Sequence, residues 1–172
     1  TFESIEILEG SRASDIIFGG NGINHLIGNN GFDRIYGRFG DDTIEGGLGR
    51  DIMFGNLGAD ILTGGTDEHA DQFSYFTGFD SGVGAGNRDI ITDFQTGLDL
   101  ISFKHLRNDA IQGNNKLSFI ADAAFSNTAG EIRYQNVDTD TIVQIDFDGD
   151  AVVDFEIELT GNMTLAANDF MF

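Results

Sequence analysis

The sequence contains no cysteine and no proline. Without cysteine, no disulfide can hold the fold, and cysteine usage gives no indication of the redox compartment. Basic residues are scarce, with nine Lys and Arg against 29 Asp and Glu, which gives a formal net charge of −20. Such a charge repels nucleic acid and anionic membrane surfaces, so neither is expected as a partner.

Long apolar runs are missing as well. No stretch approaches the roughly 20 apolar residues that cross a bilayer, so no membrane insertion is expected. The first residues, TFESIEILEG, include neither an initiator Met nor a charged-then-apolar leader. We therefore expect the chain to be part of a longer protein. Its 172 residues are enough for one domain or two small ones.

Glycine recurs at every ninth residue from Gly10 to Gly64, a period that fits neither a helix nor an ordinary sheet. The units read GSRASDIIF, GGNGINHLI, GNNGFDRIY, GRFGDDTIE, GGLGRDIMF and GNLGADILT, and GGTDEHADQF follows with two extra residues before its aspartate. Position six is acidic or amide and position eight is apolar. The position-six residues are Asp15, Asn24, Asp33, Asp42, Asp51 and Asp60, and the position-eight residues are Ile17, Leu26, Ile35, Ile44, Met53 and Leu62.

These units resemble the GGxGxDxUx nonapeptide of RTX proteins, which forms a calcium-binding β-helix. Downstream, DQFSYFTGFDS, RDIITDFQTGLDLISF, AFSNTAGEIRY, VQIDFDGDAVVDFEIELTG and LAANDFMF resemble the C-terminal region of serralysin-type secreted metalloproteases. Departures are Ser102, where an aspartate is expected, and the insertion before Asp71. The resemblance implies an all-β fold with two parts. We expect a parallel β-roll over residues 1–71 and an antiparallel β-sandwich-like part over residues 72–172, which packs on the roll and carries a terminal secretion signal.

The chemistry of one unit explains why turn and strand alternate. Glycines at positions one, two and four can take the positive φ of a tight turn, and they let carbonyl groups approach a shared point. Residues seven to nine then form a short strand whose position-eight side chain faces inward. Alternate units form two parallel sheets, so each unit stacks on the next but one and brings two position-six carboxylates together. Ca²⁺, which takes six to eight hard oxygens, would replace their repulsion with coordination.

The resemblance implies that each ion binds between two stacked turns. One turn contributes the backbone carbonyl oxygens of positions two and four and the carboxylate of position six. The turn stacked on it contributes the backbone carbonyl oxygens of positions one and three and the carboxylate of position six. The pairings are Asp15 with Asp33, Asn24 with Asp42, Asp33 with Asp51, Asp42 with Asp60, and Asp51 with Asp71. The predicted ligand residues are Ser11, Ala13, Asp15, Gly20, Gly22, Asn24, Gly28, Asn29, Asn30, Gly31, Asp33, Gly37, Arg38, Phe39, Gly40, Asp42, Gly46, Gly47, Leu48, Gly49, Asp51, Gly55, Asn56, Leu57, Gly58, Asp60, Gly64, Thr66 and Asp71. We expect about four or five calcium ions.

The acidic residues also allow interpretations without calcium. The aspartates of the repeats could simply form Asx turns. Asp146, Asp148 and Asp150 imitate an EF-hand loop, but Ala151 replaces its glycine, so a hairpin turn is favoured. The stretch RDIITDFQTGLD contains either a further calcium site or simple caps and turns, and its aspartates are Asp89, Asp93 and Asp99.

No catalytic motif is present: there is no HExxH, GxSxG elbow, phosphate loop or reactive cysteine. His25, His69 and His105 are far apart and are interpreted as surface residues.

The resemblance implies a non-catalytic, secreted, extracellular module that folds on calcium after export by a type I secretion ABC transporter. The terminal NDFMF is read either as the export signal or as a last strand. Alternatives are a polysaccharide-binding module, as in mannuronan epimerases, and an adhesin segment. An ordered basic or aromatic ladder would favour the polysaccharide.

Overall fold

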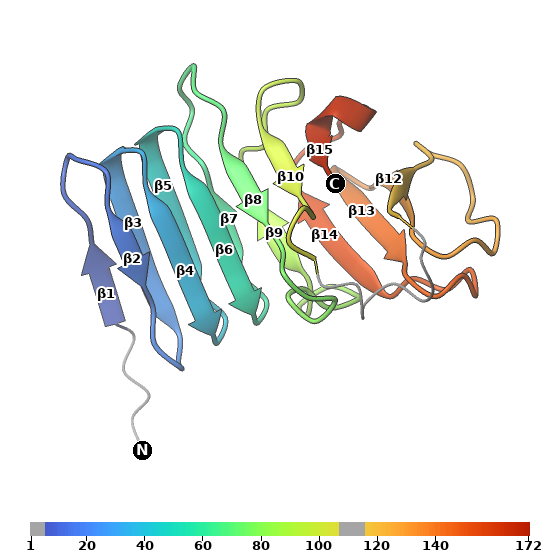
Figure 1. Cartoon of the computed structure of the whole chain (residues 1–172), viewed down its shortest axis with the longest axis horizontal. Helices are drawn as coiled ribbons and strands as arrows, with labels where there is room; N and C mark the ends of the chain where they lie inside the picture. Colours follow the sequence, from blue (N-terminus) through green and yellow to red (C-terminus); the bar gives the residue numbers. More distant parts are fainter. Residues whose placement is uncertain (1–5, 107–115) are drawn as a thin grey trace.

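The computed structural model describes residues 6–106 and 116–172, which form two sheets packed face to face. Figure 1 shows the strands following one another along the long axis, from the N-terminal end at β1 and β2 to the C-terminal part. The nine-stranded sheet has the spatial order β1 (Glu6–Glu9), β3 (Asn24–Gly31), β5 (Thr43–Gly49), β7 (Ile61–Thr63), β9 (Asp89–Ile91), β14 (Phe155–Leu159), β13 (Asp140–Asp146), β12 (Glu131–Val137) and β11 (Ser118–Phe119).

The six-stranded sheet carries the alternate units. Its order is β15 (Phe170–Met171), β10 (Leu100–Ser102), β8 (Gln72–Ser74), β6 (Ile52–Leu57), β4 (Arg34–Phe39) and β2 (Ile16–Phe18). The only helical element among the described residues is the 3₁₀ turn η1 (Ala167–Asp169). Within those residues no helix has the length and apolar character needed to cross a bilayer.

Register follows the nonapeptide period. Leu26 lies opposite Ile44 between β3 and β5, and Ile35 lies opposite Met53 between β4 and β6, so each unit pairs in parallel with the unit 18 residues later. The last three strands of the C-terminal meander, β12, β13 and β14, pair antiparallel. The predicted all-β fold, with a parallel roll followed by antiparallel strands, is confirmed.

Strand length differs from the expectation. The inner strands do not stop after position nine, because the backbone of the glycine-rich turn continues the pairing: Asn29 lies opposite Gly47, and Gly31 opposite Gly49. β3 therefore has eight residues, whereas β2 and β7 keep the expected three. The turns of alternate units stack in register, so their backbones extend the pairing of the sheet.

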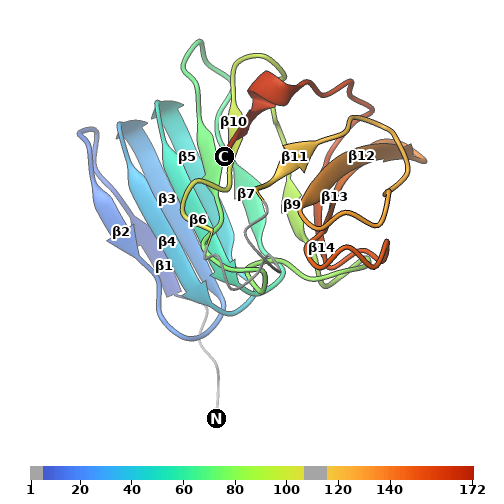
Figure 2. The same cartoon turned by 45° about the vertical axis from the view of Figure 1, so that its right-hand side comes forward.

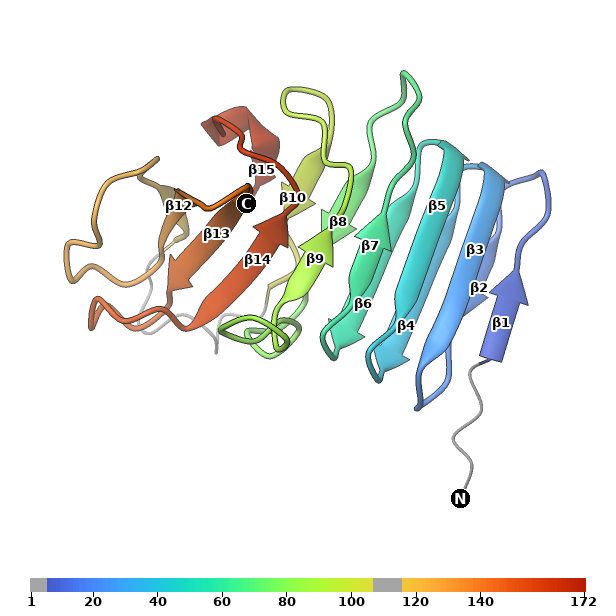
Figure 3. The same ribbon diagram turned by 180° about the vertical axis from the view of Figure 1, so that it is seen from behind.

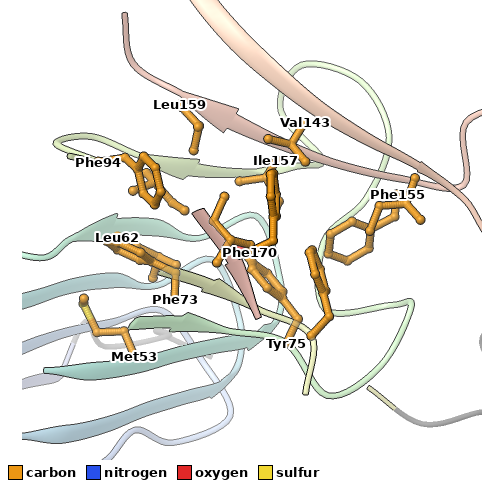
Figure 4. Close-up of a cluster of buried hydrophobic side chains, with 14 of the residues drawn as sticks. Met53, Leu62, Phe73, Tyr75, Phe94, Val143, Phe155, Ile157, Leu159 and Phe170 are labelled. Carbon is orange, nitrogen blue, oxygen red and sulfur yellow. The ribbon is translucent and has the colours of Figure 1, made fainter. Parts of the chain in front are cut away.

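The position-eight side chains fill a thin core between the sheets. Leu26, Ile35, Ile44 and Met53 are fully buried, and the same row continues through Phe73, Ile91 and Ile101 beyond the last nonapeptide. Figure 4 shows how larger rings, among them Tyr75 and Phe155, widen this core where the antiparallel strands begin. The nine-stranded sheet runs without a break from β7 through β9 to β14, as Figure 3 shows from the other side.

Candidate metal-binding turns

The position-six side chains form two rows, one along each set of stacked turns. In each row the backbone N–H of one member donates to carboxylate Oδ1 of the next. The first row, here called the odd row, joins Asp15 to Asp33 (2.7 Å), Asp33 to Asp51 (2.8 Å), Asp51 to Asp71 (2.8 Å) and Asp71 to Asp99 (2.9 Å). The even row joins Asn24 to Asp42 (2.7 Å), Asp42 to Asp60 (2.8 Å) and Asp60 to Asp89 (2.9 Å).

All five pairs named from the sequence are adjacent in these rows. The structure also extends each row by one residue, to Asp99 and Asp89, which lie among the aspartates whose role the sequence left open. A signal for them was present: Asp89 and Asp99 each stand two residues before a buried isoleucine, Ile91 or Ile101, which is the spacing of positions six and eight. Asp93 lies outside the rows and accepts the N–H groups of Gly64 and Gly65 (2.9 and 2.8 Å).

The second oxygen of the buried aspartates has no partner. Oδ2 makes no hydrogen bond in Asp33, Asp42, Asp51, Asp60, Asp71 and Asp89, and these six residues are at most 1% exposed. A buried carboxylate oxygen without a partner carries a large desolvation cost, so these atoms fit a cation. Asp15 differs, since it is accessible and its Oδ2 accepts from the N–H and the hydroxyl of Ser11 (2.6 and 2.8 Å).

The first glycine of each unit leaves room for these oxygens. A Cβ placed on Gly46 would lie 2.7 Å from Asp51 Oδ2 and 2.7 Å from the carbonyl oxygen of Gly64 in the stacked turn. A carboxylate oxygen and a carbonyl oxygen therefore converge beside Gly46, where any side chain would intrude. Both are hard oxygen ligands of the kind that Ca²⁺ prefers. The predicted set thus fits the ion at this turn.

The predicted carbonyl residues all lie in the stacked turns. Ser11 and Ala13 lie between β1 and β2, and Gly20 and Gly22 lie between β2 and β3. The other turns are formed by the ends of strands and the residues after them: Gly28, Asn29, Asn30 and Gly31 at β3; Gly37, Arg38, Phe39 and Gly40 at β4; Gly46, Gly47, Leu48 and Gly49 at β5; Gly55, Asn56, Leu57 and Gly58 at β6; and Gly64 and Thr66 after β7.

Three of these residues stand where a second glycine is usual and adopt its backbone. Asn29, Arg38 and Asn56 have φ of 77°, 82° and 68°, a left-handed conformation that asparagine tolerates and arginine rarely adopts. Arg38 donates to the Gly19 carbonyl oxygen (3.2 Å), and its guanidinium lies 5.1 Å from the centre of the Phe18 ring.

Burial shifts the protonation of the rows. Desolvation raises the pKa of Asp42 and of Asp51 to about 6, and that of Asp60 and of Asp71 to about 7, and neighbouring aspartates add to the increase. Burial likewise raises the pKa of Asp89 well above its usual value. The Ser11 hydrogen bonds lower the pKa of Asp15. The interior of each row therefore needs a proton or a cation near neutral pH.

A buried tyrosine lies at the end of the even row. Burial, and then the nearby charges of Asp89, Asp60 and Asp80, raise the pKa of the Tyr75 hydroxyl far above its usual value. Asp80 itself is satisfied by the N–H groups of Phe76 and Thr77 and by the Thr77 hydroxyl. Sequence reasoning missed Tyr75, because its position carries no repeat signal.

The acidic stretch near residue 146 forms a turn. Asp146, Asp148 and Asp154 each place a carboxylate oxygen within 4.8 Å of the others. However, buried Asp146 is satisfied by the N–H groups of Gly149 (2.6 Å) and Ala151 (2.8 Å). The stretch connects antiparallel β13 and β14, so the hairpin interpretation is confirmed. One carboxylate oxygen of Asp148 and one of Asp154 also accept backbone N–H groups, from Asp150 (3.1 Å) and Phe147 (2.7 Å).

The three histidines lie apart. His69 and His105 are exposed, and His25 is half-buried with its Nε2 2.6 Å from Glu45 Oε1. None belongs to either carboxylate row.

Comparisons with known proteins give a family match and similar solved structures. The sequence family described as peptidase M10 serralysin C terminal matches residues 9–172. Among solved structures, the R3 subunit of an Azotobacter vinelandii mannuronan C5-epimerase is 28% identical, covers 95% of this chain and 80% of its own, and has a TM-score of 0.42. The R2 subunit of that epimerase is 22% identical over 100% of this chain and 94% of its own, also with a TM-score of 0.42. No curated protein sequence matches the chain.

Proposed function

This chain belongs to the family of peptidase M10 serralysin C-terminal regions, and from that premise we propose that it is a non-catalytic module that folds on calcium outside the cell. The observation that carries the proposal is the set of buried Oδ2 atoms without partners in the two rows. Six such atoms in regular register are a cost that only a proton or a cation removes.

The residues that would hold the ions are those of the stacked turns. Between two turns of the odd row, for example, the Asp33 and Asp51 carboxylates would contribute with carbonyl groups of their own turns. Asp89 and Asp99 would complete the last turn of each row. Bound calcium supplies charge neutralisation and a cross-link between stacked turns. The chain itself supplies the rigid carbonyl groups and excludes side chains through its glycines.

Calcium concentration would then control the fold. Calcium-binding modules of the extracellular kind have dissociation constants of about 10⁻⁴ to 10⁻³ M, so the cytosol leaves them empty. A ligand that binds only the folded state stabilises it by mass action. We propose that the chain leaves the cell unfolded through a type I secretion ABC transporter and folds outside, as part of a larger secreted protein.

The division at residue 71 belongs to the same proposal. The nonapeptides end there. Residues 72–172 would form a unit that packs on the roll, and the shared core that joins Phe155 and Ile157 to Leu26 and Met53 supports this. Strands β8, β9 and β10 continue the two sheets of the roll, so this second part would give the repeats a preformed end on which to stack.

Circular dichroism tests the dependence on calcium. We expect little β signal in excess chelator and full β signal in millimolar calcium, with magnesium a poor substitute because it demands a smaller octahedral site. Asp42→Ala should lower affinity at two turns, and Asp148→Ala, a change at an exposed turn residue, should leave the calcium stoichiometry unchanged. Equal β content with and without calcium would contradict the proposal.

A second function is favoured by the outer face of the six-stranded sheet. Phe18, Tyr36, Phe54 and Phe76 form a stack with ring centres 4.9, 4.6 and 4.6 Å apart. The other outward residues on β2, β4, β6 and β8 include Ile16, Arg34 and Gln72 and no carboxylate. Ring edges carry partial positive charge, so this strip is where an anionic polysaccharide would bind, with bound calcium offsetting the repulsion by the net charge of −20.

Affinity electrophoresis in calcium can test this binding. We expect a gel containing a polyuronate to retard the protein, and a neutral glucan to have no effect. Phe18→Ala with Arg34→Ala should abolish the retardation, and Ile61→Ala, on the outer face of the other sheet, should preserve it. Equal retardation of the two variants would contradict a role for the aromatic strip.

A further inference from the structure

A buried carboxylate directly precedes the C-terminal strand β15. β15 pairs in parallel with β10, with Phe170 opposite Ile101, and forms the edge of the six-stranded sheet. Figure 2 shows the C terminus beside β10. Asp169, directly before the strand, is 1% exposed. Its Oδ1 accepts the Gly97 N–H (2.7 Å) and its Oδ2 accepts the Ala166 N–H (2.8 Å).

The Gly97 N–H belongs to the loop that ends the odd row. In this loop Asp99 Oδ2 accepts the Gln95 N–H (2.9 Å), and the Asp99 N–H donates to the Gln95 carbonyl oxygen (2.9 Å). Asp99 Oδ1 accepts the Asp71 N–H (2.9 Å). Asp99 therefore has two roles. It is the last member of the odd row, and it fixes the turn that presents the Gly97 N–H to Asp169.

We propose that this turn is a latch, through which the last ion-binding position of the odd row controls whether the C-terminal strand is docked or exposed. The proposal rests on calcium binding by the rows. With a cation between the Asp71 and Asp99 turns, the loop stays closed and the Gly97 N–H faces Asp169. Without one, the two carboxylates repel, the turn opens, and Asp169 loses a donor while buried, which favours release of the strand.

Release would expose an apolar segment that the docked state hides. Phe170 is 6% exposed, and its ring centre lies 4.9 Å from that of Phe119. Figure 4 shows Phe170 among the core side chains. The Phe103 N–H donates to the Met171 carbonyl oxygen (2.8 Å), which fixes the strand along its backbone as well. A receptor that binds the terminal residues would therefore meet them only when the end of the row is empty.

Hydrogen–deuterium exchange on the full chain tests the latch. In saturating calcium we expect Asp169→Asn to raise the exchange rate of the peptide spanning 164–172 about tenfold or more, because a buried charge-assisted hydrogen bond is lost. Peptides from β3 to β6 should exchange as in the unmodified protein. Asp99→Asn should move the midpoint of tail protection to about tenfold higher calcium and leave the midpoint of the β3 to β6 peptides in place, because global unfolding would move both together. Asp148→Asn, at an exposed turn, should change neither.

The outcomes separate the latch from calcium-dependent folding. If the repeat peptides respond to calcium and the tail peptide exchanges equally with and without it, the latch is wrong and the proposed function stands. If the repeat peptides are equally protected in chelator, calcium-dependent folding itself is wrong. Tail exchange that Asp169→Asn leaves unchanged would also overturn the latch.

Discussion

At the scale of single residues, the glycines of the turns differ in how strictly they are required. Gly49 has φ of 119°, and a Cβ there would overlap the carbonyl oxygen of Gly31 in the turn beneath it. Gly22 occupies the same position of an earlier unit, but its Cβ would meet nothing within 4 Å. Gly22 also does not have the positive φ of Gly49, so its backbone conformation is one that a residue with a side chain adopts without strain.

We therefore expect Gly49→Ala to lower the free energy of unfolding in calcium by about 2 kcal/mol or more, through left-handed strain and the collision with backbone. Gly22→Ala should change it by less than about 0.5 kcal/mol. Urea denaturation of both variants in saturating calcium provides the measurement. Similar losses from the two substitutions would show that the collision is relieved elsewhere.

The buried carboxylates also predict how pH acts on the calcium-free protein. The folded-state pKa of Asp42 and Asp51 is about 6 and that of Asp60 and Asp71 about 7, above the ordinary value of 3.8. A raised pKa means that the folded state binds more protons, so its stability is greatest below the ordinary pKa and is lost as pH rises to about 7.

Calcium-free protein prepared by dialysis should accordingly gain β signal when the pH falls from 8 to 5. In calcium the dependence should reverse, because protons compete with the ion for the same oxygens. Circular dichroism at the two pH values, with and without calcium, compares the signs directly. A calcium-free protein that loses structure toward pH 5 would contradict the assigned burial.

At the scale of elements, the aromatic stack ties four successive strands and loops of one sheet together. Phe54 lies in the middle, 4.6 Å from both Tyr36 and Phe76 between ring centres, and is 5% exposed although it points away from the core. Phe54→Ala should lower the free energy of unfolding by about 3 kcal/mol. Phe79→Ala, at a ring that is 82% exposed, should be nearly neutral. Thermal denaturation in calcium measures the melting temperature of each variant. Equal shifts in melting temperature would mean that the stack does not contribute to stability.

The period of nine was enough to predict the strands, their parallel pairing and the inward row from Leu26 to Met53. It was not enough to predict the strand ends, because turn residues such as Asn29 combine positive φ with continued pairing. Asp89 and Asp99 were left open since loops of unequal length precede them and hide the period. The aromatic stack was missed for a similar reason: Phe76 comes from a position outside the repeat, and only the fold brings it onto Phe54.

At the scale of the whole molecule, a partly buried ionic network joins the loop after β8 to the antiparallel strands. Arg88 contacts Glu156 (2.9 Å) and Glu158 (2.6 Å), and Glu156 also accepts from Gln144 Nε2 (2.7 Å) and the Gly84 N–H (2.8 Å). This loop leads directly into Asp89 and β9, where the roll meets the C-terminal part. The network therefore holds the last member of the even row in place.

Removing the cation from this network should affect the junction. Arg88→Ala leaves Glu156, which is 6% exposed, without its charged partner, and we expect a loss of about 3 kcal/mol in the free energy of unfolding. Arg50→Ala, at an exposed turn position, should cost less than about 0.5 kcal/mol. Urea denaturation in calcium measures both. A neutral Arg88→Ala would mean that the two parts are held by the sheets alone.

The odd row has unlike ends. Asp15 is accessible and already satisfied by Ser11, whereas Asp99, at the other end, is 2% exposed. Each interior member donates to one neighbour and accepts from the other, so order at one turn favours order at the next, as in a one-dimensional chain. Such a chain with one anchored end has an origin and a direction. We expect protection from hydrogen exchange to appear first in β7 to β10 and to spread toward β1 as the calcium concentration rises.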